Sequence, residues 1–440
     1  MALLSSLLLA WNLPPFQAPD ELTQMLRADL LTHGAIAGER IRLGDGWAGG
    51  GPADLVIVSA HAPFQPIQNH PDAKLRAIDL QRAHAVRWDG VVAPIAFPNT
   101  ATYPPFFYLP QTAAIGLGKL LNLSVVQTLY LARAANAVSC SLIGFLALLL
   151  AGRARLALYS LLLLPMSVSL YGAVTQDGMK IVVAALGAAL IGRAAAERRA
   201  MTWAEILAAA LCFALVGMSK MPFAPIGLLP LFAGGTPWRR RLAATLLSLV
   251  LAAGWHAWMA LEVHTSLYRP DAPTDQAAQL AFLLAHPQAI PAIALETLQR
   301  LGGRYAAQFI GILGWLDVML PPPYYPAAAF VLLLSVLPLL PPPRDGRGPL
   351  LAATAIIALA IGAAIFGALY LAWTPVGSSV VEGVQGRYFL PLAVLLPLVL
   401  DRPRTEPGPL LRAIEAIILA FPAVSLLVVQ RAVVIRYYLD

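Results

Sequence analysis

The chain alternates long apolar runs with short polar stretches, and one long polar region follows the first run. Runs of roughly 20 apolar residues are long enough to cross a bilayer as helices. We therefore predict an all-α integral membrane protein, 1–440, forming one membrane domain with about 11 transmembrane helices. The predicted spans are 1–13, 124–151, 156–173, 179–195, 203–218, 222–234, 242–261, 324–341, 349–372, 388–400 and 409–430.

Composition agrees with this pattern. Of the 440 residues, 59% are hydrophobic and 12% are charged, whereas soluble domains carry roughly a quarter charged residues. The formal net charge of +7 does not indicate a nucleic-acid partner, because basic residues of membrane proteins record orientation. Cys140 and Cys212 both fall inside apolar runs, so no disulfide is expected. Because the predicted spans cross a bilayer, we expect membrane lipid to be a partner of this protein.

Arginines sort the predicted loops into two classes. They occupy every second loop, at 153–155, 193–199, 239–241, 344–347 and 402–412. The positive-inside rule places these loops in the cytoplasm, together with the N-terminus. The intervening loops are then extracytoplasmic, and the two large ones are 14–105 and 262–323. The unusual polar motifs all fall in this second class: 20–21, 103–108, 176–178, 219–220, 314–317 and 383–388.

The first large loop carries amphipathic and interfacial segments. DELTQMLRADLLTH, from Asp20 to His33, places Leu22, Met25 and Leu30 on one helical face. Gly- and Pro-rich stretches at 44–52 and 61–71 read as loops. The segment 103–120 opens with a proline pair and predicts an interfacial helix.

Asp20 and Glu21 form an acidic pair at the start of that amphipathic helix. One interpretation is structural: Asp20 is the N-cap and Glu21 a favourable first-turn anion. The other is catalytic: Asp20 is a general base, and Glu21 assists it or orients the acceptor. Both interpretations stay open at this point.

Two cations lie at predicted outer span ends and are candidates for binding a phosphate. Arg387 in GVQGRYF can form a bidentate fork, and Lys220 in GMSKMPF can act as a point charge. Gly386 would let backbone N–H groups approach the phosphate, and Tyr388 completes the predicted donor site. The alternative is that the cations snorkel to lipid head groups.

Further polar residues on the same predicted face are candidates for lining a substrate site. They are Tyr103, Tyr108, Gln111, Asp177, Trp315 and Asp317. Asp177 can also be read as a helix cap, and the aromatic residues as interface anchors. No paired His or Cys motif predicts a metal site. Mg²⁺ or Mn²⁺ bridging Asp20 and a phosphate is chemically reasonable, but no residue pattern requires it.

Several motifs together resemble a bacterial multi-pass membrane family known only as a domain of unknown function. They are PPFQAPDE, YPPFFYLPQ, PMSVSLYGAVTQDG, SKMPF, GWLD and GVQGRYFLPL, spanning about Pro14 to Pro391. More remotely, the chain is similar to the GT-C glycosyltransferases, which carry an acidic motif in the first outer loop. The chain departs from many of them in lacking a large soluble C-terminal domain.

This resemblance implies a GT-C-like enzyme of the bacterial inner (plasma) membrane. It would be an inverting glycosyltransferase that moves a sugar from a polyprenyl-phosphate donor to an extracytoplasmic cell-envelope glycan, lipid or protein. The alternative is a non-catalytic transporter or flippase of lipid-linked glycans that uses Arg387 and Lys220 only to hold a phosphate.

Overall fold

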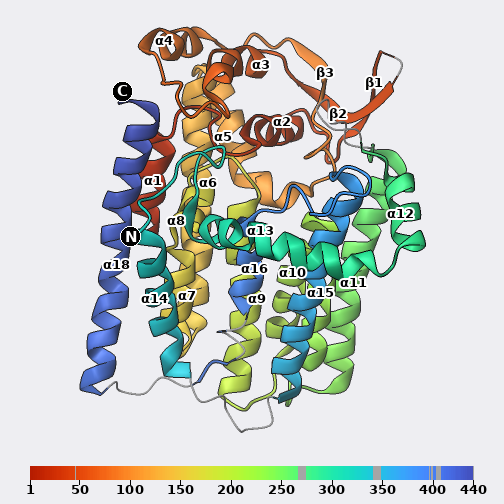
Figure 1. Ribbon diagram of the computed structural model, residues 1–440, viewed down its shortest axis with the longest axis vertical. Coiled ribbons are helices and arrows are strands. Elements are labelled where there is room, and N and C mark those ends of the chain that lie inside the picture. The colour runs from red at the N-terminus through yellow and green to blue at the C-terminus, as the bar shows by residue number, and fades with distance from the viewer. Residues whose placement is uncertain are drawn as a thin grey trace.

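The computed structural model describes residues 1–439 except 45, 266–273, 340–347, 396, 398–399 and 403–407. Arg344, Arg347 and Arg404 of the predicted basic loops lie outside the described residues. The described chain is mostly helical and has two parts, a bundle of helices and a cap on one end of it (Figure 1).

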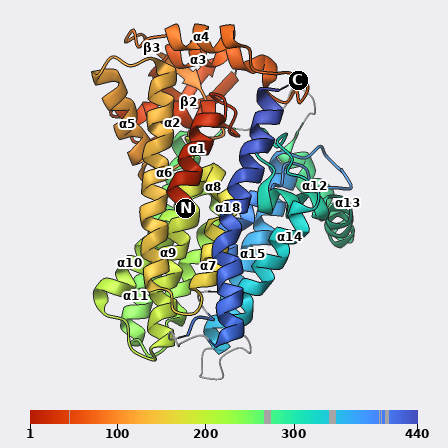
Figure 2. The same ribbon diagram turned by 90° about the vertical axis from the view of Figure 1, so that its left-hand side faces the viewer.

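The bundle contains the long helices together with shorter ones that pack between them (Figures 1 and 2). Its elements are α1 (Ala2–Asn12), α6 (Val125–Leu150), α7 (Arg155–Leu162), α8 (Pro165–Tyr171), α9 (Asp177–Ala196), α10 (Trp203–Ser219), η3 (Met221–Phe232), α11 (Trp238–Glu262), α14 (Tyr324–Val336), η4 (Leu337–Leu339), α15 (Gly348–Ala372), η5 (Gly386–Phe389), α16 (Leu390–Ala393) and α18 (Pro409–Tyr437). A bent pair, α12 (Gln276–Ala285) and α13 (Ala289–Gly311), lies at the side of the bundle.

Five described helices are long and apolar enough to cross a membrane, and a sixth span results if the bent pair is counted as one. The five are α6, α9, α11, α15 and α18. The predicted count of eleven spans is not confirmed. Proline explains part of the difference, because it removes a backbone donor and clashes with the preceding turn. The predicted span 156–173 is divided before Pro165 into α7 and α8, and 222–234 is a 3-10 helix containing Pro225 and Pro230.

The cap contains a small antiparallel sheet with strand order β1-β2-β3, which corrects the all-α prediction. The cap elements are α2 (Glu21–Thr32), β1 (Glu39–Leu43), β2 (Gly46–Asp54), α3 (Val56–His61), η1 (Ala62–Ile67), α4 (Ala77–Ala85), β3 (Val92–Ala96), η2 (Pro105–Tyr108) and α5 (Leu109–Leu120). Most of the stretch 44–52, predicted as a loop, forms β2. Its glycines allow a close strand approach, since a Cβ on Gly50 would overlap the carbonyl oxygen of Ile95.

The two ends of the bundle differ in the way that the arginine pattern predicts. At the end opposite the cap, the Asp401 carboxylate accepts hydrogen bonds from the backbone of Gly152 and Ala154. Arg240 donates to the carbonyl of Met201 at that same end. The described basic loops therefore gather away from the cap. Which side of the membrane each end faces remains a prediction.

The last helix is joined to the cap and to the first helix. Arg436 of α18 donates to the backbone carbonyls of Ile67, His70 and Ala73 in the cap. The Tyr438 hydroxyl donates to the carbonyl of Asn12, 2.8 Å away. Figure 2 shows α1 and α18 lying close together beneath the cap.

Candidate functional site

A cavity of about 690 Å³ lies where the cap meets the bundle. It is bounded by the loop after β3, the α10–η3 junction, the ends of α11 and α15, and the segment leading into η5. Its lining residues are Asp20, Pro98, Asn99, Thr102, Tyr103, Ser219, Lys220, Met221, His256, Met259, Ala260, His264, Leu369, Trp373, Gly383, Gln385 and Tyr388. The cavity thus brings together residues that are far apart in the sequence.

Asp20 occupies the N-cap position of α2, but its side chain does not cap the helix. Its φ of 60° places the backbone in the left-handed region, where non-glycine residues are uncommon. The carboxylate instead accepts from Asn99 at 3.3 Å and lies 3.3 Å from a terminal guanidinium nitrogen of Arg387. The capping interpretation is therefore wrong for its side chain, and the carboxylate, 39% exposed, faces the cavity.

Arg387 lies beside Asp20 between two carboxylates, and neither Arg387 nor Asp177 is among the residues that line the cavity. Its side chain is almost fully buried, with Asp20 on one side and the Asp177 carboxylate 3.8 Å from its Nε on the other. Within the described part of the chain, that Nε–H has no hydrogen-bond partner. Asp177, the first residue of α9, is held in turn by the Lys180 ammonium at 2.7 Å. Arg387 therefore donates to Asp20 through a terminal nitrogen, while its Nε–H lies near Asp177 without a hydrogen bond.

Lys220, unlike Arg387, lines the cavity. Its ammonium lies 5.5 Å from the centre of the Tyr103 ring and 4.7 Å from that of Tyr388, within the range of cation–π attraction. The ion pairs found among the described residues do not include Lys220. Burial raises the pKa of Tyr103 to about 12, so its hydroxyl stays neutral and can donate a hydrogen bond. Of the charged groups in this cluster, Asp20 and Lys220 line the cavity, whereas Arg387 and the buried pair of Asp177 and Lys180 lie outside its lining.

Glu21 lies outside this cavity, contrary to its predicted catalytic or orienting role. It is fully buried and forms a bidentate ion pair with the Arg133 guanidinium, at 2.6 and 2.8 Å. One of its oxygens also accepts from the backbone N–H of Val174. Arg133 donates further to the carbonyls of Ala10, Leu13 and Pro14. These contacts give Glu21 a structural role at the junction of α1, α6 and α8.

Tyr108 and Gln111 are predicted to line the site, but both are buried in the cap–bundle packing. The Tyr108 hydroxyl donates to the side-chain oxygen of Gln24. The Gln111 amide donates to Asn136 at 2.9 Å and to the carbonyl of Thr175 at 3.2 Å. Gln111 thus supports the turn before Asp177, one layer behind the cavity.

Trp315 and Asp317 also lie away from the cavity lining. The indole N–H of Trp315 donates to the carbonyl of Phe16, 3.1 Å away. The Asp317 carboxylate pairs with Arg436 at 2.6 Å, and both side chains are almost fully buried. They join the 312–318 turn to the cap and to α18, respectively.

Gly386 is explained by close packing and not by an approach to a phosphate. A Cβ there would overlap the carbonyl oxygen of Tyr305 and the amide nitrogen of Phe309. Its own N–H already donates to the Gln308 side chain at 2.9 Å. Gly386 therefore allows the turn that carries Arg387 to pack closely against α13, in place of the predicted role of its backbone in binding a phosphate.

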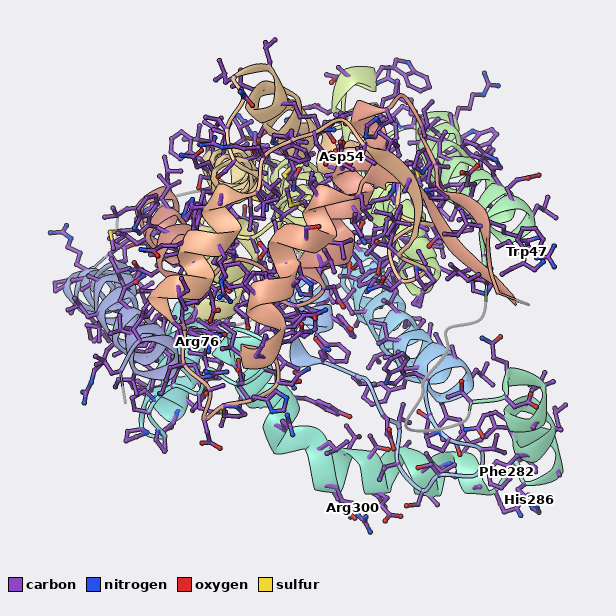
Figure 3. All side chains as sticks on the ribbon, turned by 90° about the horizontal axis from the view of Figure 1, so that it is seen from above. Trp47, Asp54, Arg76, Phe282, His286 and Arg300 are labelled. Carbon is purple, nitrogen blue, oxygen red and sulfur yellow. The ribbon has the colours of Figure 1, made fainter. Side chains whose placement is uncertain are left out.

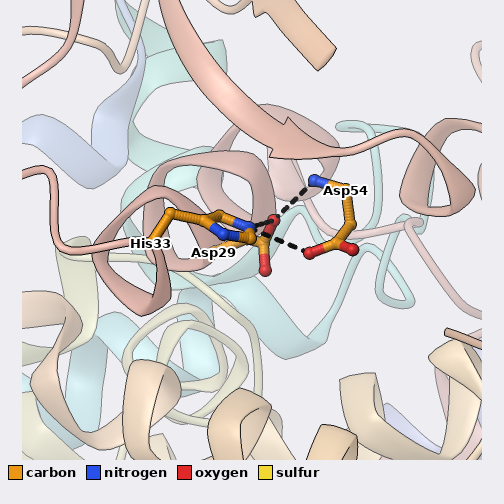
Figure 4. Close-up of side chains that lie close together, drawn as sticks. All are labelled: Asp29, His33 and Asp54. Atoms are coloured by element: carbon orange, nitrogen blue, oxygen red, sulfur yellow. Dashed lines mark hydrogen bonds and ion pairs between the residues drawn. The ribbon is translucent and has the colours of Figure 1, made fainter. Parts of the chain in front are cut away.

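Among the described residues, one group of three side chains has the spacing of a metal site: Asp29, His33 and Asp54 in the cap (Figure 4). His33 Nε2 lies 2.9 Å from Asp54 and 3.4 Å from Asp29. The Lys119 ammonium already contacts both carboxylates, at 2.5 and 2.6 Å. This cluster, which does not line the cavity, is thus a closed set of ion pairs around a lysine.

Sequence reasoning missed several cavity residues. Asn99 fixes Asp20, and it comes from the proline-rich stretch just before the YPPFFY motif. His256, inside the predicted span 242–261, donates its Nε2–H to the Gly217 carbonyl, 2.9 Å away, and also lines the cavity. No local sequence pattern marked Trp373 or Gln385 as cavity residues. Trp373 follows a predicted span, and Gln385 lies inside GVQGRYF.

Fold and site together define a multi-pass membrane protein with a cavity under a cap, lined by both apolar and polar side chains. Residues 3–396 match the family described as "Predicted membrane protein (DUF2142)". The chain belongs to that family, whose function is unknown. No curated protein and no solved structure matches the chain significantly.

Proposed function

We propose that this protein is a membrane glycosyltransferase whose cavity binds the phosphate-sugar head of a polyprenyl-phosphate donor. The observation that carries the proposal is that the Asp20 carboxylate and the Lys220 ammonium line one cavity, with Arg387 3.3 Å from Asp20. A base and two cations at such distances match the needs of sugar transfer from an anionic leaving group.

In the proposed reaction, an acceptor hydroxyl attacks the anomeric carbon while Asp20 takes its proton. The new carbon–oxygen bond forms as the bond from the anomeric carbon to the phosphate oxygen breaks. The electron pair of that bond leaves with the polyprenyl phosphate, and Lys220 and Arg387 stabilise the charge. A single displacement of this kind inverts the anomeric configuration.

Asp20 and the incoming phosphate compete for the same guanidinium. A terminal nitrogen of Arg387 lies 3.3 Å from the Asp20 carboxylate and donates a hydrogen bond to it. A phosphate that engages Arg387 through a bidentate fork weakens that contact. Donor binding would thereby leave an Asp20 oxygen available for a hydrogen bond from the acceptor hydroxyl.

The remaining lining supplies polar and aromatic surfaces for sugars. Tyr103, Trp373 and Tyr388 present aromatic rings, and the acceptor is an extracytoplasmic cell-envelope glycan, lipid or protein. Asp20 is the single carboxylate among the cavity-lining residues that the structure describes. One protein ligand does not build a metal site, so no step in this proposal uses Mg²⁺ or Mn²⁺.

The test uses purified protein in liposomes with polyprenyl-phosphate-sugar donors and envelope extract as acceptor. Asp20→Asn is expected to lower the transfer rate by roughly 10²- to 10⁴-fold, the usual contribution of a general base. Asp72→Asn, an exposed cap carboxylate, is the matched control and should leave the rate unchanged. Transfer that persists in Asp20→Asn at the wild-type rate would remove Asp20 as the base.

The same preparation distinguishes the transporter alternative. Lys220→Ala and Arg387→Ala are expected to weaken donor binding and transfer together. If no transfer occurs with any donor, but lipid-linked glycan crosses the bilayer in a way that requires Arg387 and tolerates Asp20→Asn, the transporter function replaces the enzyme.

A further inference from the structure

The bent helix pair α12–α13 has a sharply two-sided exposed surface. The two helices meet at 112°, and α13 lies across the bundle, roughly perpendicular to the spans (Figure 1). Large apolar side chains are left uncovered on both helices: Leu280, Leu284, Ile290, Leu295 and Leu298. Leu284 is 74% exposed. Such a concentration of uncovered apolar surface marks an interaction site.

Charged residues occupy a different face of α13. Glu296, Arg300 and Arg304 recur at four-residue spacing, which places them together on one side of a helix. Arg300 pairs with Glu296 at 2.5 Å and is 65% exposed. Figure 3, seen from above the cap, shows Arg300 projecting from the outer side of α13, away from the bundle. At 100° per residue, Leu295 and Leu298 fall on another side of the exposed surface.

This division excludes two placements of the pair. If α13 crossed the hydrocarbon core, three charged side chains would be exposed to lipid, where charged groups are costly. If the pair stood in water, Leu295 and Leu298 would remain 58% and 56% exposed to it. A helix that lies in the plane of the membrane interface can place its leucines among acyl chains and its charged side chains among the head groups.

We propose that α12 and α13 lie in the membrane interface on the cap side, with their leucines among acyl chains and Arg300 and Arg304 at the lipid phosphates. The partner is the lipid surface of the bilayer that the bundle spans. This inference is independent of the enzymatic activity proposed above.

The pair is also joined to the segment that shapes the cavity. Gln279 of α12 accepts from the backbone N–H of Gly377 at 2.9 Å. On α13, Thr297 accepts from Val381 and Gln308 accepts from Gly386, each at 2.9 Å. All three polar side chains are almost fully buried. The segment 377–386, which contributes Gly383 and Gln385 to the cavity, is therefore held by an element that rests on lipid.

The test measures depth in the bilayer with spin labels on the full-length protein in nanodiscs. Single cysteines replace Leu295, Leu298, Glu296 and Arg300 in a Cys140→Ala, Cys212→Ala background, and each variant is first checked for a monodisperse size-exclusion profile. Labels at 295 and 298 are expected to be more accessible to dissolved oxygen, and labels at 296 and 300 to a water-soluble nickel chelate.

Two results would overturn the proposal. Preferential access of nickel to all four labels would place the pair in water. Preferential access of oxygen to all four would make the pair a broken transmembrane span. Neither outcome depends on a sugar donor, so failure here is distinguishable from failure of the proposed enzymatic function.

Discussion

Adjacent residues of the acidic pair belong to two regions with opposite electrostatic character. Glu21 lies in a closed region, where both of its oxygens contact Arg133 and the guanidinium is saturated by backbone carbonyls. Asp20 lies in an open region, where its carboxylate is 39% exposed and faces a cavity. The Nε–H of its partner Arg387 lies 3.8 Å from Asp177 and has no hydrogen-bond partner among the described residues. A closed set of charges stabilises the fold, whereas an open set can exchange its contacts for those of a ligand.

The largest expected effect concerns the closed pair. Glu21→Gln leaves the buried Arg133 without a counter-charge and should lower the free energy of unfolding by about 3 to 5 kcal/mol. The measurement is thermal unfolding in detergent micelles. Asp20→Asn, one residue away, is the matched control and should unfold close to wild type. If the two variants were equally stable, the contrast between closed and open regions would be lost.

An intermediate effect is expected at the turn that carries Arg387. Gly386→Ala forces a Cβ against the backbone of Tyr305 and Phe309, and overpacking of this kind costs about 1 to 3 kcal/mol. Gly302→Ala in α13 is the control, because a Cβ there meets nothing within 4 Å; this variant should be neutral or slightly more stable. The same unfolding assay compares the two. A Gly386→Ala protein as stable as Gly302→Ala would show that the turn is not held by close packing.

The smallest expected effect is at the second closed region, around Lys119. Added Zn²⁺ or Mn²⁺ should not shift the unfolding temperature of the wild-type protein, because the lysine ammonium already occupies the space between Asp29 and Asp54. In Lys119→Ala, two carboxylates and His33 become available, and a bound ion stabilises the folded state by mass action. A metal-dependent increase in the wild type would show that the cluster is open to cations.

Much of the bundle could be predicted from the sequence, because hydrophobic length reports directly on spans such as α6, α11 and α15. The shorter predicted spans are not confirmed, since proline shortens or unwinds helices that hydropathy alone cannot distinguish. The strand at 46–54 was missed because its many glycines resemble a loop, although here they permit strands to approach closely.

The candidate site was predicted in part for an equally physical reason. Motifs near span ends on one face indicated that Asp20, Lys220 and Arg387 lie at the same end of the bundle, and the structure brings them together. The burial of Glu21 was missed, although Arg133 gave a usable signal, because an arginine inside an apolar span requires a buried partner. Asp317 was misjudged because Arg436, its partner, lies 119 residues later and beyond the predicted end of the last span.

The contacts of Arg436 bear on the order in which the protein is made. Its bond to the carbonyl of Ala73 joins residues 363 positions apart. At a synthesis rate of about 5 to 20 residues per second, the ribosome reaches this arginine roughly 20 to 70 seconds after Ala73. During that interval the cap has been translated, but Arg436, which donates hydrogen bonds to its backbone carbonyls, has not. The cap can therefore reach its final structure only near the end of biogenesis.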